Sequence, residues 1–204
     1  MNYFVTAIDT DSGKTLVSAI LCEALEADYW KPVQAGLPRD NQTVKNLVTN
    51  TRTEIHPETY LLKTPASPHA SAKREGVTIS LEQFKIPQTH NDNLVIEGAG
   101  GCLVPLNDQD MVVDLIKSFD ADVIVVSDLY LGSINHTLLT IEALQNRKVK
   151  IKGIIFNGES NPESERIILL RSGLKCLLRI DQERHIHPGI VKQYAKTLIA
   201  HWNE

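Results

Sequence analysis

The sequence predicts an α/β fold in which helices flank a doubly wound, mainly parallel sheet. Short apolar runs of strand length alternate with segments whose apolar residues recur at helical spacing, the pattern expected of βαβ units. Most of the runs lack a polar residue at every second position, which is typical of parallel strands covered on both faces. With 42% hydrophobic and 23% charged residues among 204, the chain can bury one large core without disulfides.

Five apolar runs have the length of strands. They are residues 3–8, 29–33, 94–96, 123–126 and 151–156. Three segments carry apolar residues at helical spacing and are predicted to be amphipathic helices. They are residues 17–25, 134–144 and 190–202.

The stretch 36–92 is rich in Thr, Pro and His, and we expect loops that cap the sheet, with short helices near 41–48 and 80–84. No repeat, low-complexity tract or Gly/Ser linker marks a boundary along the sequence. We therefore expect one nucleotide-binding domain over residues 1–204.

The charge balance argues against a nucleic-acid-binding protein, and the short apolar runs argue against an integral membrane protein. The 21 Lys and Arg against 25 Asp and Glu give a formal charge of -4, whereas nucleic-acid binders show a basic stripe. The run 3–8 is short, has no basic leader, and no window reaches the ~20 apolar residues of a membrane span. Cys22, Cys102 and Cys176 fit neither a disulfide framework nor a zinc site, so we expect reduced thiols in the cytoplasm.

A phosphate-binding loop is predicted between the first strand and the first helix, where the chain reads Asp9-Thr10-Asp11-Ser12-Gly13-Lys14-Thr15. Small residues let backbone amides converge on phosphate oxygens at a helix N-terminus. Lys14 would neutralise the β and γ phosphates, and the Thr15 hydroxyl would bind magnesium. An ordinary strand-to-helix turn is the alternative, but the position between strand and helix favours the phosphate loop.

Two further charged residues follow predicted strands. Lys31 is placed to supply the second cation that a loop containing Asp9 and Asp11 requires; a solvated lysine at a strand end is the alternative. Glu97 follows the strand 94–96 and precedes several glycines, as an acid would that completes a magnesium site. Its alternative is a solvated residue in a glycine-rich turn.

The segment Gly132-Ser133-Ile134-Asn135-His136 opens a predicted helix. Its backbone amides could receive a carboxylate, or Ser133 could simply cap the helix. Neither His136 nor His69 has metal-ligand spacing to another His or Cys, so we assign no zinc.

With these pieces in order, the chain resembles the dethiobiotin synthetases, ATP-dependent enzymes of the P-loop NTPase superfamily that close the ureido ring in biotin biosynthesis. The resemblance spans most of the chain. Its markers are Tyr3-Phe4-Val5-Thr6, the loop at residues 9–15, Lys31-Pro32-Val33, Pro65-Ala66-Ser67-Pro68-His69, Glu97-Gly98-Ala99-Gly100-Gly101 and Leu131-Gly132-Ser133-Ile134-Asn135-His136.

The resemblance implies the role of each matched residue. The catalytic set is Lys31, Lys14 and Thr10. The nucleotide is held by Asp11, Ser12, Gly13, Lys14, Thr15, Leu16, Asp40, Glu97, Gly98, Ala99, Gly100 and, at the adenine, Asn157. The magnesium ligands are Thr15, Asp40 and Glu97. The substrate contacts are Thr10, Lys31, Ala35, Gly132, Ser133, Ile134 and Asn135.

The same resemblance implies the reaction. The substrate 7,8-diaminononanoate captures CO2 as a carbamate, which attacks the γ-phosphate of the co-substrate ATP; the second amine then closes the ring and expels phosphate. Mg²⁺ is the implied cofactor, and a homodimer with substrate contacts across its interface is the implied assembly. Such chemistry needs charge and positioning rather than a covalent nucleophile.

Some residues depart from the family pattern. Ala7 stands in place of a usual Gly, Asp11 in place of Glu, and Ala35 in place of a Ser or Thr near the substrate, which removes a hydrogen bond worth roughly 0.5 to 1.5 kcal/mol. The stretch 176–181 lacks the usual adenine-side motif, so the preferred base is open.

Two rivals stay open at this point: a nucleotide-switched partition or positioning ATPase of the same fold, and a catalytically inactive nucleotide-binding subunit. Asp9 stands where the first normally has a second lysine. Retention of Lys14, Thr15, Lys31 and Glu97 argues against the second.

Overall fold

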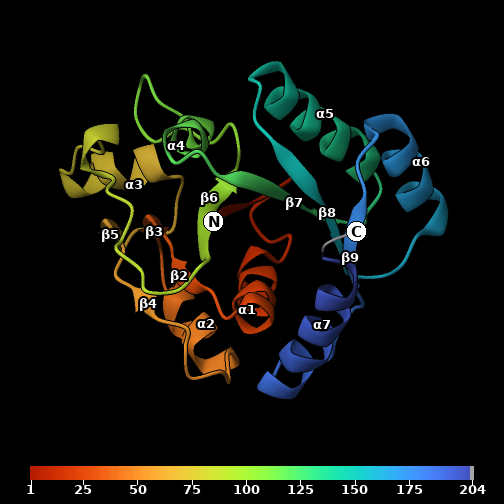
Figure 1. Ribbon diagram of the computed structural model, residues 1–204. Coiled ribbons are helices and arrows are strands. Elements are labelled where there is room, and N and C mark those ends of the chain that lie inside the picture. Colours follow the sequence, from red (N-terminus) through yellow and green to blue (C-terminus); the bar gives the residue numbers. More distant parts are fainter. Residues whose placement is uncertain (203–204) are drawn as a thin grey trace.

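The computed structural model describes residues 1–202 and centres on a seven-stranded sheet (Figure 1). Its strands are β1 (Asn2–Ala7), β2 (Asp28–Trp30), β4 (Ile55–His56), β6 (Leu94–Gly101), β7 (Asp122–Asp128), β8 (Ile151–Asn157) and β9 (Cys176–Ile180). They are arranged in the order β4-β2-β6-β1-β7-β8-β9, and every neighbouring pair is parallel. The predicted doubly wound parallel sheet is therefore confirmed.

Helices cover both faces of the sheet (Figure 1). One face carries α1 (Lys14–Leu25), α2 (Asp40–Leu47) and α7 (Pro188–His201). The other carries α3 (Pro68–Glu75), α4 (Val112–Ser118), α5 (Ser133–Asn146) and α6 (Pro162–Ser172). Consecutive strand residues feed the two cores alternately: Val5 packs on the α1 side and Phe4 on the opposite side, because strand side chains alternate between faces. Both positions are apolar, which explains the unbroken apolar runs.

The predicted strand 29–33 is wrong as a single element. The chain leaves the central sheet after Trp30 and enters a second, two-stranded parallel sheet in which β3 (Val33–Ala35) pairs with β5 (Tyr60–Leu62). Pro32 lies at the break and has no amide hydrogen for a sheet ladder, while its carbonyl oxygen accepts from the amides of Thr59 and Tyr60 at 3.0 Å each. Lys31 consequently lies at the bend.

The segment 36–92 contains more regular structure than the expected loops. The helix near 41–48 is confirmed as α2, and the one near 80–84 is a single 3-10 turn, η1 (Leu81–Gln83). The sequence did not predict α3, β4 and β5 within this segment, nor α4, α6 and β9 in the C-terminal half of the chain. Strands of two or three residues carry no readable period, and α3 buries only Pro68, Ser71 and Ala72.

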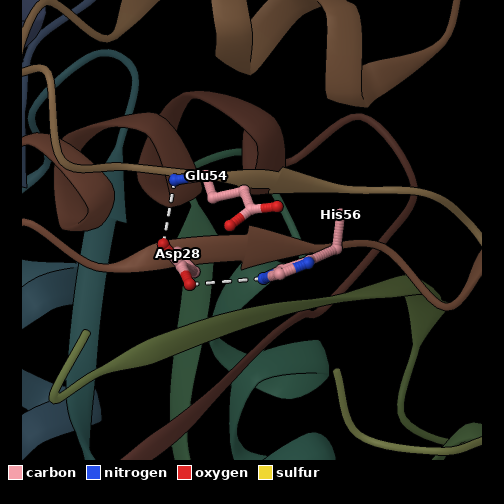
Figure 2. Close-up of side chains that lie close together, drawn as sticks. All are labelled: Asp28, Glu54 and His56. Atoms are coloured by element: carbon pink, nitrogen blue, oxygen red, sulfur yellow. Dashed lines mark hydrogen bonds and ion pairs between the residues drawn. The ribbon is translucent and has the colours of Figure 1, made fainter. Parts of the chain in front are cut away.

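Asp28 fastens part of this segment to the sheet (Figure 2). One of its carboxylate oxygens accepts from the Glu54 amide at 2.8 Å and from Asn91 Nδ2 at 2.6 Å. The other accepts from the Thr89 hydroxyl and lies 3.3 Å from His56 Nε2. Asp28, Glu54 and His56 bring potential metal-ligand atoms within 4.8 Å of one another. The donors around both Asp28 oxygens make the cluster a hydrogen-bonded junction between β2, β4 and the 89–91 loop.

The predicted C-terminal helix is confirmed as α7, which packs on α1 through its apolar side. Beyond it, Trp202 meets the ring of Tyr3 edge-on, with centroids 5.1 Å apart. Among residues 1–202, no helix combines the length and the apolarity needed to cross a bilayer. The three cysteines are free thiols, of which Cys22 and Cys102 are buried.

Candidate active site

The loop after β1 and the start of α1 form the first part of the site. Gly13 adopts φ +97°, in the left-handed region that favours glycine, and directly precedes the helix. A Cβ there would lie 2.3 Å from Asn157 Nδ2. Asn157 ends β8 and donates that nitrogen to the Ser12 carbonyl at 3.0 Å. The phosphate loop is therefore held by β8, which lies two positions from β1 in the sheet.

Lys14 is folded over its own loop. Its Nζ donates to the carbonyl oxygens of Asp9 at 2.9 Å and Thr10 at 2.8 Å. Burial lowers the pKa of Lys14 to about 8, while the negative charge of Glu97 opposes that shift. A phosphate placed against the loop would offer Lys14 anionic acceptors in exchange for two carbonyls, and charge-assisted hydrogen bonds are the stronger kind.

Glu97 lies at the centre of the site, and its position corrects the predicted end of the strand 94–96. The sequence predicts that the strand ends at residue 96 and that Glu97 follows it. In the structure β6 continues to Gly101, so Glu97 lies inside the strand, and its side chain is 1% exposed. Its Oε1 accepts from the Thr15 hydroxyl at 3.0 Å and from Lys31 Nζ at 2.8 Å. The solvated alternative for Glu97 is thereby excluded.

Lys31 joins two acids. Besides Glu97, its Nζ contacts a carboxylate oxygen of Asp40, the first residue of α2. Burial disfavours the ammonium, but the charges of Glu97 and Asp40 outweigh it and raise the pKa of Lys31. In the same way, burial acts to raise the pKa of Glu97, and the charge of Lys31 outweighs it and lowers that pKa. Both groups are therefore charged at neutral pH, and Lys31 is no solvated strand-end lysine.

Two residues that contact this cluster were not predicted from the sequence as part of the site. The hydroxyl of Tyr29 in β2 donates to Glu97 Oε2 at 2.9 Å. Gln34 in β3 accepts from the Asp40 amide at 3.0 Å and so holds the start of α2. Both are buried. An aromatic residue and an amide inside strands give no sequence signal of function, because side chains of these types also serve as ordinary core or turn residues.

The oxygen donors present fit a magnesium ion. Lys31 Nζ contacts the carboxylates of Glu97 and Asp40, and the Thr15 hydroxyl donates to the same Glu97 oxygen. Mg²⁺ prefers hydroxyl and carboxylate oxygens as ligands, usually one or two carboxylates with phosphate and water. An ammonium that bridges two acids marks a place that already favours positive charge.

A pocket of about 560 Å³ opens over these residues. Ten predicted site residues line it: Thr10, Asp11, Lys14, Thr15, Lys31, Ala35, Asp40, Glu97, Ala99 and Gly100. Its outer wall includes Pro65, Ala66, Ser67 and Pro68, the segment that leads into α3. Five predicted nucleotide residues do not line it: Ser12, Gly13, Leu16, Gly98 and Asn157. Leu16, for example, packs against the core on the α1 side.

The predicted substrate residues 132–135 lie apart from that pocket, at the start of α5. Gly132 has φ +111° and precedes the helix, and the buried Ser133 hydroxyl has no hydrogen-bond partner among residues 1–202. A second, more apolar cleft of about 340 Å³ lies between the start of the phosphate loop and the middle of α5. It is lined by Ile8, Asp9, Thr10, Gly101, Cys102, Leu103, Val104, Leu139, Thr140 and Ala143. Thr10 borders both cavities.

A strand-to-helix loop with Lys14 and Thr15, opposite a buried acid on the neighbouring strand, defines a P-loop nucleotide-binding protein. A family model described as an AAA domain matches residues 1–188. ATP-dependent dethiobiotin synthetase BioD from Cytophaga hutchinsonii is 58% identical, with 99% of this chain and 98% of that protein covered. The proteins of the same name from Christiangramia forsetii and Agrobacterium fabrum are 48% and 40% identical, covering 96% and 95% of this chain and 94% and 92% of their own. The chain belongs to the ATP-dependent dethiobiotin synthetase family.

Solved structures at low identity share the fold. A ParA family ATPase from Chlorobium tepidum superposes with a TM-score of 0.60 at 12% identity, covering 96% of this chain and 98% of its own. The septum site-determining protein MinD from Pyrococcus horikoshii, complexed with Mg-ADP, gives 0.57 at 11%, covering 97% and 96%. These likenesses establish the P-loop ATPase fold.

Proposed function

We propose that this chain is a dethiobiotin synthase, an ATP- and magnesium-dependent ligase of biotin biosynthesis that converts 7,8-diaminononanoate and CO2 to dethiobiotin, with release of ADP and phosphate. The single observation that supports this most is the buried cluster of Thr15, Lys31 and Glu97 beside the phosphate loop. Together with Lys14 of the loop, it supplies two lysines and an acid where a nucleoside triphosphate and a second anion would meet.

The reaction divides into steps that keep charge in balance. One amine of the substrate attacks CO2 and loses a proton, which gives a carbamate anion. A carbamate oxygen then attacks the γ-phosphorus, the bond to the bridging oxygen breaks, and ADP leaves. The second amine attacks the carbonyl carbon of the carbamic-phosphoric anhydride, loses a proton and expels phosphate as the ring closes. Each anionic species needs cations at fixed positions rather than a nucleophilic side chain.

Lys14 and Lys31 supply those cations. Lys14 would leave its two carbonyl acceptors and contact the phosphates. Lys31, held charged by two acids, would hold the carbamate against the γ-phosphate despite their mutual repulsion. Magnesium, bound by Thr15, Asp40 and Glu97, would neutralise phosphate charge.

The two cavities accommodate the rest of the substrates. Thr10 borders both and would orient the diamine, with Ala35 close to it in the larger pocket. The apolar cleft along α5 suits an aliphatic chain. The amides at Gly132 to Asn135 and the unpartnered Ser133 hydroxyl would receive the substrate carboxylate, across the interface of a homodimer. Asn157 would contact the adenine beside the loop it braces.

We place this enzyme in the cytoplasm and treat residues 1–204 as one domain. The ParA-like fold by itself is equally compatible with a nucleotide-dependent switch, so the decisive test is product formation. The protein is mixed with 7,8-diaminononanoate, bicarbonate, magnesium and ATP, and dethiobiotin is measured by mass spectrometry while phosphate release is followed. One phosphate per dethiobiotin supports the proposal. Phosphate release that ignores the diamine would favour the switch, and no release would favour a binding subunit.

Lys31→Ala should abolish dethiobiotin formation while ATP binding persists, because Lys14 and the loop amides still hold the nucleotide. Calorimetry of ATP binding and mass spectrometry of the product test the two parts separately. Lys45→Ala, on the far end of α2, is a control that should leave both unchanged. Ring closure at a normal rate in Lys31→Ala would contradict the assigned role.

A further inference from the structure

Tyr29 is a fully buried residue whose hydroxyl is turned toward the site rather than toward solvent. It lies in β2 opposite Val95 of β6. Glu97 is two residues beyond Val95 and therefore projects from the same face of the sheet. Diagonal neighbours on adjacent strands are within reach of an aromatic side chain, which is how the Tyr29 hydroxyl meets Glu97 Oε2 at 2.9 Å.

This contact divides the two oxygens of Glu97 between different partners. Oε2 accepts from Tyr29 on the core side, and Oε1 accepts from Thr15 and Lys31 on the pocket side. A carboxylate that is anchored through one oxygen cannot rotate freely about its last bond. The other oxygen consequently keeps its direction toward Thr15.

We propose that Tyr29 is a positioning residue, which fixes the orientation of Glu97 so that Oε1 stays available for the divalent cation of the bound nucleotide. The proposal rests on the proposed function of the site. Tyr29 itself touches neither the pocket nor the reacting atoms: it does not line the large cavity. Its effect is transmitted through one hydrogen bond to a charged acceptor, the kind that contributes most.

The chain offers a closely matched control. Tyr3 of β1 also pairs with Val95, from the other side of β6, and belongs to the same core as Tyr29. Its hydroxyl contacts Met1 Sδ at 3.6 Å, away from Glu97. Tyr29→Phe and Tyr3→Phe each remove the hydroxyl of a buried tyrosine whose backbone pairs with Val95, and only the first removes a donor to Glu97.

The test is a titration of nucleotide binding with Mg²⁺, measured by calorimetry with β,γ-imido ATP and no diamine, so that it does not depend on turnover. Tyr29→Phe should require about fivefold to tenfold more Mg²⁺ for half-saturation, from the loss of one charge-assisted hydrogen bond. In turnover at saturating Mg²⁺, kcat should recover toward the wild-type value. Tyr3→Phe should match the wild type. Equal Mg²⁺ dependence in all three proteins would overturn the proposal.

A double-mutant cycle with Glu97→Gln separates positioning from general destabilisation. If Tyr29 acts through Glu97, adding Tyr29→Phe to Glu97→Gln should change the Mg²⁺ requirement no further. If the two substitutions instead raise the Mg²⁺ requirement independently and additively, the proposal is overturned. This holds even if thermal unfolding shows that Tyr29→Phe is less stable than the wild type. A failed dethiobiotin assay combined with the expected Mg²⁺ titrations would count against the reaction and leave the role of Tyr29 standing.

Discussion

At the scale of single residues, buried charges in this protein are stable because each is surrounded by partners. Removing a carboxylate and an ammonium from water costs several kcal/mol per ion unless geometry and hydrogen bonds compensate. Glu97 and Lys31 meet that condition through Thr15, Tyr29 and Asp40. Replacing Glu97 would leave Lys31 with Asp40 alone, and replacing Lys31 would leave Glu97 with two hydroxyl donors and no cation in contact. Glu97 and Lys31 therefore depend on each other for stability as well as for function.

Asp28 presents the same situation away from the pocket. Burial acts to raise the pKa of its carboxyl, but the hydrogen bonds from Thr89, the Glu54 amide, Asn91 and His56 outweigh burial and lower it. A carboxyl whose pKa is lower in the folded than in the unfolded state adds stability above its unfolded pKa of about 3.9. That contribution is lost as the pH falls through the folded-state pKa.

Asp28→Asn should therefore lower the free energy of unfolding by about 1 to 2 kcal/mol at pH 7. The difference from the wild type should shrink below about pH 4, where the wild-type carboxyl also becomes neutral. Urea denaturation between pH 7 and below about pH 4 measures this difference in the free energy of unfolding. Asp108→Asn, on an exposed loop, is the control. A difference that is the same at every pH would show that shape rather than charge matters at Asp28.

At the scale of elements, the phosphate loop depends on a strand that is remote in sequence. Gly13 needs its positive φ to turn the chain into α1, and its open side is filled by the amide of Asn157 from β8. Asn157 is thus a structural brace in addition to any contact with the base. The packing of α1 on the sheet and the shape of the loop are set together at this point.

Gly13→Ala should lose more stability than a positive φ alone explains. Gly158→Ala is the matched control: Gly158 has φ +101° and a Cβ there would meet no atom within 4 Å, against φ +97° and a 2.3 Å contact at Gly13. We expect about 1 kcal/mol from the backbone in Gly158→Ala and roughly 1 to 3 kcal/mol more from the clash in Gly13→Ala. Thermal unfolding compares the stability of the two variants. Equal losses of stability would disprove the structural role proposed for Asn157.

At the scale of the whole molecule, exposed leucines gather around α5. Leu131, directly before the helix, is fully exposed, and Leu103 and Leu139 border the apolar cleft. Side chains of this kind on one side of a molecule are typical of a contact surface. Leu131 directly precedes Gly132, the first of the amides proposed to receive the substrate carboxylate, which fits a homodimer whose interface completes that subsite.

If this surface forms the proposed homodimer interface, Leu131→Glu should shift the protein from dimer to monomer and raise the KM for 7,8-diaminononanoate, while the affinity for ATP stays unchanged. Burying a carboxylate in an apolar interface costs more than most dimers can offset. Sedimentation velocity and steady-state kinetics measure the two effects. Leu170→Glu, at an exposed position of α6, is the control. A variant that remains dimeric with an unchanged KM would remove this surface from the interface.

The α/β class, the main strands and the phosphate loop could be predicted from the sequence, because these depend on local properties: apolar period, chain length and the residues between a strand and a helix. The same local signals predict a site that contains Lys14, Thr15, Lys31 and Glu97. They could not show that β2 ends before Lys31 or that β6 runs on past Glu97, since sheet pairing decides where a strand stops.

Which side chains meet was settled by the folded chain alone. Tyr29, Asp40 and Glu97 come from three separate elements. Tyr29 meets Glu97 because β2 pairs with β6, and Asp40, at the start of α2, is linked to Glu97 through Lys31. Asn157 reaches the phosphate loop from 145 residues away along the chain. The physical reason is that hydrogen bonds and ion pairs depend on distance in space, which a buried tyrosine or a strand-end asparagine does not reveal until the sheet is assembled.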